Sequence, residues 1–166
     1  MPSTYLEALA IKYPKVNVSS LDSGSEYEML VHEGGDPMPT KGELDIAKLS
    51  VDKEFIWRDI QMLRDTRKAA GVKVGAHWFH SDDTSRIQHL GLVMMGANMP
   101  SNLMWKTMGS TFVLMTPTLA QQIFMQIAFN DQAIFAKAEF HRAEINKLDN
   151  PYQYIITTGW PPIFGE

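Results

Sequence analysis

The chain has 166 residues, of which 45% are hydrophobic and 20% are charged, and it contains no cysteine. This composition is typical of a folded globular protein of about one domain, and the lack of cysteine excludes a disulfide framework, a zinc ribbon and a thiol nucleophile. The net charge of -4 gives no general attraction to phosphate backbones or anionic membranes, so we expect no nucleic-acid partner.

Two N-terminal segments have the alternating pattern of half-buried strands. They are Lys15–Leu21 and Tyr27–Glu33, and the turn sequence DSGS lies between them, which predicts a β-hairpin. The next segment, Gly34–Glu43, contains three glycines and two prolines and predicts a linker or an extended arm. We therefore place a β-rich N-terminal section at residues 1–50 and a second domain at residues 51–166.

The second domain is expected to begin with a helix. Asp52 is its predicted N-cap, apolar side chains recur at steps of three and four residues, and Gly71 is its predicted stop. The segment Val72–Phe79 then predicts a single strand. A further helix, capped by a residue of the Ser-Asp-Asp run at 81–83 and ended by Asn98, has one apolar face. That face comprises Ile87, Leu90, Met94 and Ala97.

The C-terminal half predicts a hairpin and a long helix. Two apolar, aromatic runs flank Met108-Gly109-Ser110, which predicts a β-hairpin. Thr116-Pro117 is a cap and first-turn pair, and a helix of about 45 Å is predicted after it, up to Asn150-Pro151. Its apolar stripe is longer than one small core requires, so we expect part of it to pack on a partner. The stripe comprises Leu119, Ile123, Ile127, Ile134, Ala138, Ile145 and Leu148.

Together these elements predict an α+β fold. We expect a small, mainly antiparallel sheet with a hairpin, two medium helices and one long C-terminal helix, in addition to the β-rich N-terminal section. No window approaches the roughly 18 consecutive apolar residues that span a bilayer, and the N-terminus lacks the charged-then-apolar layout of a secretory signal. We therefore expect no membrane insertion and a protein made in the cytoplasm.

The densest group of polar residues is HWFHSDD at residues 77–83. His77, His80, Asp82 and Asp83 are of the types that bind zinc, manganese or iron. Residues three apart on a strand point to opposite faces, so the two histidines converge only if the chain turns there. A strand end whose aspartates cap the next helix is the interpretation that fits the spacing better.

Other catalytic patterns are weak or missing. Ser81, His80 and Asp83 are neighbours in sequence, whereas the members of a Ser-His-Asp triad usually meet across the fold, and the G-x-S-x-G elbow is absent. No dinucleotide or phosphate-loop motif occurs. The mixed charges around Arg58 and Arg64 are typical of a solvated helix face. We predict no catalytic residue, no cofactor and no metal ligand.

Methionine is abundant, with 11 residues, and many of these lie around the second helix and the hairpin. Flexible thioethers fill irregular cores and also line adaptable protein interfaces. Core packing is the expected role of each single methionine, whereas the cluster as a whole favours a surface that binds a partner. The candidate partner-binding residues are Met94, Met95, Met99, Ile127, Ile134 and Trp160.

Short motifs follow one another in a defined order along about two-thirds of the chain. They are RDTR at 64–67, WFHSDDTSR at 78–86, WKT at 105–107, an apolar run ending at Thr116, the long helix, and GWP at 159–161. In this order they resemble an uncharacterised domain family of tailed bacteriophages and prophages, which occurs in tail-fibre polypeptides or in small open reading frames beside them. Many members of that family have Asp-Gly or Asn-Gly at the hairpin turn, where this chain has Met108-Gly109.

The resemblance implies a place in a phage tail. The family has no established enzymatic residues, so the chain is expected to be a structural protein that binds tail-fibre or baseplate proteins and acts in host attachment. We expect a homo-oligomer or another symmetric assembly, located in the tail of the virion after assembly in the host cytoplasm, with residues 1–50 as an attachment module. A tail-fibre assembly chaperone that is absent from the mature virion is the alternative. A small metal-dependent hydrolase is the remote third possibility.

Overall fold

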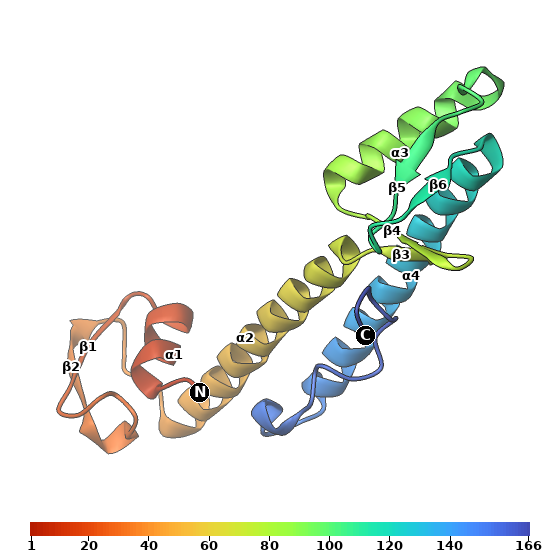
Figure 1. Cartoon of the computed structure of the whole chain (residues 1–166). Helices are drawn as coiled ribbons and strands as arrows, with labels where there is room; N and C mark the ends of the chain where they lie inside the picture. The colour runs from red at the N-terminus through yellow and green to blue at the C-terminus, as the bar shows by residue number, and fades with distance from the viewer. The chain divides into compact units, whose positions relative to one another are not determined.

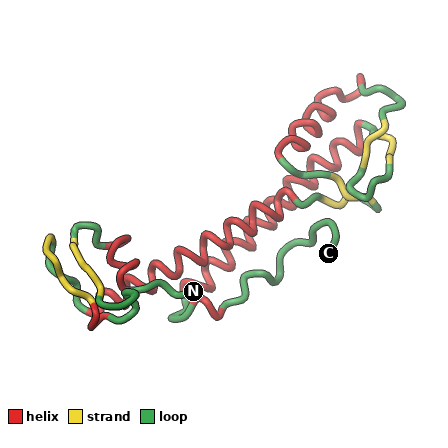
Figure 2. Tube along the Cα trace, turned by 60° about the vertical axis from the view of Figure 1, so that its left-hand side comes forward, coloured by secondary structure: helices red, strands yellow, loops and turns green.

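The computed structural model describes all 166 residues as four α-helices and three two-stranded antiparallel sheets, with short 3-10 turns between them (Figure 1). The chain divides into two compact units: unit 1 comprises residues 1–60 and 141–156, and unit 2 comprises residues 61–140 and 157–166. The strands form only short hairpins, and two long helices supply most of the helical residues (Figure 2). The fold class is α+β, as predicted.

Unit 1 begins with helix α1 (Tyr5–Lys12), which the sequence analysis missed. Thr4 and Glu7 form a capping box in front of it: the Glu7 N–H donates to the Thr4 hydroxyl over 3.1 Å, and the Thr4 N–H donates to the Glu7 carboxylate over 2.7 Å. Backbone N–H groups at the start of the helix therefore have hydrogen-bond partners. It shares one core cluster with the first turns of the next helix, through Tyr5, Ala8, Leu9, Leu44 and Ala47.

A β-hairpin follows in unit 1, as predicted. Strand β1 (Val16–Ser20) pairs antiparallel with β2 (Leu30–Gly35), with an irregularity between Asn17 and Val18. The second strand begins later than predicted because Tyr27–Met29 forms a 3-10 turn, η1. The N-terminal section is thus a helix and a hairpin rather than a purely β-rich segment.

Helix α2 (Lys41–Ala69) begins earlier than predicted. Thr40 and Glu43 cap it reciprocally: the Thr40 N–H donates to the Glu43 carboxylate over 2.8 Å, and the Glu43 N–H lies 3.3 Å from the Thr40 hydroxyl. Asp52 is buried inside the helix, where it accepts a 2.6 Å hydrogen bond from the backbone N–H of Ser3. The predicted N-cap at Asp52 is therefore wrong, and the predicted boundary after residue 50 falls within a continuous helix.

In unit 2 the end of α2 leads into a second hairpin, formed by β3 (Val72–Val74) and β4 (His77–Phe79). The predicted helix stop, Gly71, has a φ of 98°, and Gly75 in the hairpin turn has a φ of 58°. Both angles lie in the left-handed region that glycine adopts at little cost. The predicted single strand from 72 to 79 is wrong, because the chain reverses direction at Gly75.

Helix α3 (Asp83–Met95) begins after Asp82, whose carboxylate accepts a 3.0 Å hydrogen bond from the Ser85 N–H. This confirms the predicted cap. The helix buries His89 and Leu92, and a 3-10 turn, η2 (Gly96–Asn98), follows it. The predicted apolar face is exposed to solvent instead of buried. Its residues Ile87, Leu90 and Met94 are 71%, 43% and 79% exposed.

The third hairpin pairs β5 (Met104–Lys106) with β6 (Phe112–Leu114), as predicted. In the connecting loop the left-handed residue is Ser110, with a φ of 62°, rather than Gly109. The Met108 N–H donates to the Trp78 carbonyl of β4 over 2.9 Å, and a Cβ placed on Gly71 would lie only 2.4 Å from the Met108 sulfur. Met108 is therefore a packing residue, which explains a methionine at this position of the turn.

Helix α4 (Pro117–Asn146) follows the hairpin, and its Leu119 N–H lies 3.1 Å from the Thr116 hydroxyl, which confirms the predicted cap. A 3-10 turn, η3 (Pro151–Gln153), lies beyond it in unit 1. None of the helices has the length and apolar character needed to cross a membrane. The core of unit 2 joins β3, β4, α3 and the first half of α4 through Val72, Phe79, Leu92, Met99, Met115, Ala120, Ile123 and Ile127.

Candidate functional site

Ser81, in the polar corner at residues 77–86, is fully buried and bound to the backbone. Its hydroxyl donates to the Lys68 carbonyl over 2.7 Å and accepts from the Gly71 N–H over 2.9 Å. These two bonds satisfy polar groups where α2 ends. No histidine lies within hydrogen-bond distance of this hydroxyl, so the structure does not form the Ser-His-Asp arrangement that sequence proximity suggests.

Arg86 is the most highly connected side chain of the polar corner. It binds both carboxylate oxygens of Asp131 on α4, at 2.6 and 2.9 Å, and donates to the carbonyls of Lys68, at 2.9 Å, and Ser81, at 2.5 Å. The two side chains of the ion pair are 21% and 22% exposed. A bidentate guanidinium–carboxylate pair of this kind fixes orientation as well as charge. Arg86 therefore ties α2, α3 and α4 together within unit 2.

The polar corner does not gather a set of metal ligands. His77 and His80 are both exposed, and no group of three or more His, Asp or Glu side chains lies close enough to hold a metal ion. Asp82 is engaged by the hydroxyl and the N–H of Ser85, which lower the pKa of its carboxyl. The polar residues that look like a catalytic or metal site in the sequence instead cap helices and join them to one another.

His89 is a fully buried histidine in unit 2. Its Nε2 donates to the His80 carbonyl over 3.1 Å, and its ring contacts those of Phe79 and Trp105, with centroids 6.5 and 5.4 Å away. Its Nδ1 has no hydrogen-bond partner. Burial lowers the pKa of His89 below its ordinary value, and the His80 imidazole lowers it further, whereas the bond to the His80 carbonyl and the charge of Asp82 raise it. His89 is therefore held as the neutral imidazole.

The depressed pKa of His89 predicts a loss of stability in mild acid. The unfolded chain takes up a proton near pH 6.5, whereas the folded chain resists protonation, so the stability is present above pH 6.5 and falls as the pH drops below it. Urea unfolding at steps from pH 7.5 to 5.5 measures this. We expect His89→Phe to flatten the slope relative to the wild type. An unchanged slope would show that another group titrates in this window.

The β5–β6 hairpin presents one face inward and one outward. Trp105 and Val113 form a cross-strand pair and pack on the core of unit 2. The residues before and after Trp105 and Val113 along the two strands have side chains on the opposite face of the hairpin, because side chains alternate between the two faces of a strand. This hairpin outer face carries Met104, Phe112 and Leu114, which are 52%, 63% and 47% exposed.

Helix α3 carries the second exposed apolar face of unit 2. Ile87, Leu90 and Met94 lie three, four and seven residues apart, so they share one side of the helix, and Met95 lies next to Met94 at the edge of that side. We call this the α3 outer face, and it comprises Ile87, Leu90, Met94 and Met95. Isolated exposed apolar side chains are ordinary in a monomer, whereas a row of them along a helix is typical of a binding surface.

A third apolar region lies on α4 beside the β3–β4 hairpin. Met125 and Phe129 are 55% and 58% exposed and line a groove of about 430 Å³ together with Val74 and Gln122. Phe135 on the same helix is 42% exposed and has two cations near its ring, with the Arg64 guanidinium 5.0 Å and the Lys68 ammonium 5.2 Å from the ring centre. Cations at this distance attract an aromatic ring.

The structure separates the six predicted partner-binding residues into two groups. Met94 and Met95 are 79% and 47% exposed and lie on the α3 outer face. The other four, Met99, Ile127, Ile134 and Trp160, are buried within the chain, so they are packing residues. Sequence reasoning instead missed exposed residues of the two outer faces, above all Ile87, Leu90, Phe112 and Leu114.

Comparison with known proteins gives a single family match. The family model described as Domain of unknown function (DUF4376) matches residues 51–157, which include most of unit 2 and both outer faces. No curated protein and no solved structure matches the chain.

Proposed function

The chain belongs to the family described as Domain of unknown function (DUF4376), and from that premise we propose that it is a protein-binding component of a bacteriophage tail. In this proposal it is associated with the tail fibre or the baseplate, and it acts through protein–protein contacts in tail assembly and host attachment. The phage context comes from the ordered motifs between RDTR at 64–67 and GWP at 159–161.

The observation that carries the protein-binding role is the pair of exposed apolar faces in unit 2. The α3 outer face and the hairpin outer face leave large aliphatic, thioether and aromatic side chains in water, including Met94 at 79% and Phe112 at 63% exposure. Burying such side chains gains about 25 cal/mol for each Å² of apolar surface removed from water. A protein partner that covers these faces would recover that free energy. Both faces lie within residues 51–157, the part of the chain that the family model matches.

An assembly chaperone is the second candidate, and the chemistry of the same faces favours it. Met94, Met95 and Met104 are three of the seven side chains on the two faces, and all are exposed. Methionine has three rotatable bonds, so a surface rich in it adapts to partners of different shape. A chaperone uses such a surface transiently, whereas a structural component keeps it covered in the finished particle.

Quantitative mass spectrometry of purified particles, with the infected-cell lysate measured alongside, tests the proposal. A structural component is expected in the particles at a fixed ratio to the major fibre protein, in a copy number that follows the symmetry of the tail. Presence in the lysate alone, with the fibre protein co-purifying, would replace the structural role by the chaperone role. Absence from particles and from any complex with a tail protein would contradict both.

A further inference from the structure

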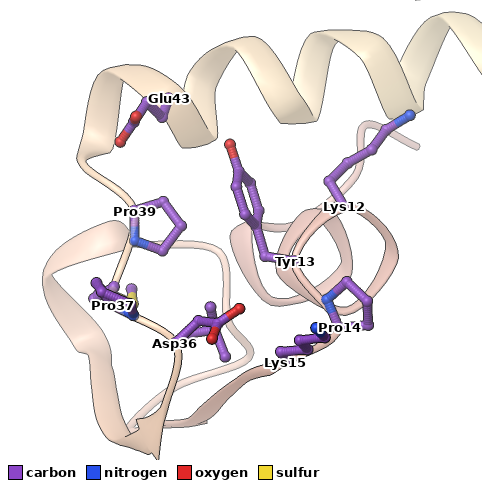
Figure 3. Close-up of a pocket in the computed structure, with 10 residues that line it drawn as sticks. Lys12, Tyr13, Pro14, Lys15, Asp36, Pro37, Pro39 and Glu43 are labelled. Carbon is purple, nitrogen blue, oxygen red and sulfur yellow. The ribbon is translucent and has the colours of Figure 1, made fainter.

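Unit 1 contains a pocket of about 490 Å³ that lies outside the residues matched by the family model (Figure 3). One wall runs from the last turn of α1 into β1 and carries Lys12, Tyr13, Pro14 and Lys15. The facing wall runs from Asp36 through Pro37 and Pro39 to Glu43 at the start of α2. Figure 3 shows the Tyr13 ring standing between the two walls.

The walls of this pocket are held in place before any ligand binds. The Tyr13 N–H donates to the Leu9 carbonyl over 2.8 Å, and the Tyr13 carbonyl accepts from the Val16 N–H over 3.0 Å. The Tyr27 hydroxyl donates to the Pro39 carbonyl over 3.0 Å, which fixes the facing wall. A preformed site loses less conformational entropy on binding than a flexible one.

The walls are joined at their base, where the chain passes very close to itself. The Asp36 N–H donates to the Lys15 carbonyl over 3.1 Å. Gly35 has a φ of 86°, and a Cβ on it would lie only 2.0 Å from that same carbonyl oxygen. Glycine therefore permits the approach that brings the two walls together.

Charge is divided between the two walls. Lys12 and Lys15 lie on one wall, and Asp36 and Glu43 lie on the other. Lys12 is paired with Glu54 at 2.5 Å, whereas the Lys15 and Asp36 side chains have no ion-pair partner. A ligand that carries an acidic group toward the first wall and a basic group toward the second complements this arrangement.

The surface between the charges favours an extended peptide in the polyproline II conformation. Tyr13, Met38, Pro14 and Pro37 offer ring and aliphatic surface, whereas Pro39 is buried. Proline has no N–H to donate, so Pro37 and Pro39 cannot supply the regular hydrogen bonds that an added β-strand requires. A polyproline II segment needs no such ladder, and it packs on aromatic surface with its own backbone hydrated. The pocket is also open to solvent, which suits a peptide better than an enclosed small molecule.

We propose that this pocket binds a proline-containing extended peptide of a partner protein that carries one acidic and one basic side chain. The Tyr13 ring packs on the prolines of the peptide, Lys15 attracts its acidic side chain, and Asp36 attracts its basic side chain. The pocket shares no residue with the apolar faces of unit 2, so a test of this site does not depend on the proposed function.

Titration of the full-length protein, labelled with 15N, tests the proposal with synthetic peptides. The probes are acetyl-EPPLPK-amide and acetyl-KPPLPE-amide, which cover both chain directions, and acetyl-EAALAK-amide is the control without proline. We expect at least one proline peptide to shift the amide signals of residues around the pocket, such as Tyr13, Lys15 and Asp36. We expect the alanine peptide to bind about tenfold more weakly or not at all.

Three variants identify the binding groups. Tyr13→Ala is expected to weaken binding of the proline peptide about tenfold or more, and Tyr13→Leu removes the ring but keeps apolar bulk if the alanine variant does not fold. Replacing the glutamate of the peptide by glutamine should weaken binding about twofold to fivefold in the wild type and have no effect in Lys15→Gln. Lys73→Gln, an exposed lysine of unit 2, is the matched control and should behave as the wild type.

Two results would overturn the proposal. The first is no signal shift around the pocket at millimolar concentrations of either proline peptide. The second is a folded Tyr13→Ala or Tyr13→Leu protein that binds the peptide with wild-type affinity together with a Lys15→Gln protein that still discriminates glutamate from glutamine.

Discussion

Phe79→Ala is expected to lower the free energy of unfolding by about 3–5 kcal/mol. Phe79 is fully buried in the core of unit 2, where its ring contacts that of His89. Removing the ring loses its transfer free energy and leaves a cavity that close-packed neighbours fill only in part. Urea-induced unfolding, followed by tryptophan fluorescence, measures the change.

Phe112→Ala is the matched control for this prediction. It makes the same chemical deletion in the same unit, at a side chain that is 63% exposed on the hairpin outer face. Substitutions at exposed sites usually change stability by no more than about 0.5 kcal/mol. Similar losses in both variants would mean that Phe112 is packed in the free chain, and the hairpin outer face would then not be available to a partner.

Arg86→Ala is expected to cost about 2–4 kcal/mol. The change removes both bonds to Asp131 and the bonds to the Lys68 and Ser81 carbonyls. It leaves the Asp131 carboxylate, only 22% exposed, without its cation. Arg86→Lys should recover little of the loss, because an ammonium cannot make the bidentate contact of a guanidinium. Thermal or urea unfolding of the three proteins gives the comparison.

The control for Arg86 is an ion pair on the surface. Lys147 lies 2.6 Å from Glu144, with the lysine side chain 66% exposed. Lys147→Ala should change stability by no more than about 0.5 kcal/mol, because water screens such a pair. Equal effects of Arg86→Ala and Lys147→Ala would contradict the role of the polar corner as the joint between α2, α3 and α4.

Local signals in the sequence predicted several elements correctly. Thr116 before Pro117 marked the start of α4, Asp82 marked the start of α3, and Gly71 marked the end of α2. Each of these depends on a hydrogen bond or a backbone angle within a few residues of the signal. Two capping boxes of the form Thr-x-x-Glu, at Thr4 and Thr40, were equally local but were overlooked.

Other elements depend on contacts that sequence spacing does not reveal. Asp52 has the chemistry of an N-cap, yet it lies inside α2, and its carboxylate accepts a hydrogen bond from the backbone N–H of Ser3, 49 residues away. Helix α3 has apolar side chains on two faces, and the tertiary core selects the face with His89 and Leu92. Periodicity alone marks an apolar face without saying which side the rest of the fold will cover.

The same limit applies to the candidate site. The corner that sequence proximity presents as a catalytic or metal site is used to cap and join helices, through Ser81, Asp82 and Arg86. Of the three methionines named as partner-binding candidates, Met94 and Met95 are exposed, whereas Met99 is buried. The exposure of a side chain depends on which parts of the fold pack against it, so it could not be predicted from the sequence alone.

The most direct test of the proposed function is the copy number of a surface variant in purified particles. Met94→Glu combined with Phe112→Glu places a charge on each outer face of unit 2, and Gln132→Glu adds a charge at an exposed polar position of α4 as the control. We predict that the double variant keeps the wild-type unfolding midpoint but is reduced at least about tenfold in the particles, because a buried unpaired charge costs several kcal/mol at an interface. The control should be incorporated normally. A folded double variant present at the wild-type copy number would contradict the account, because the two apolar faces would then have no part in binding.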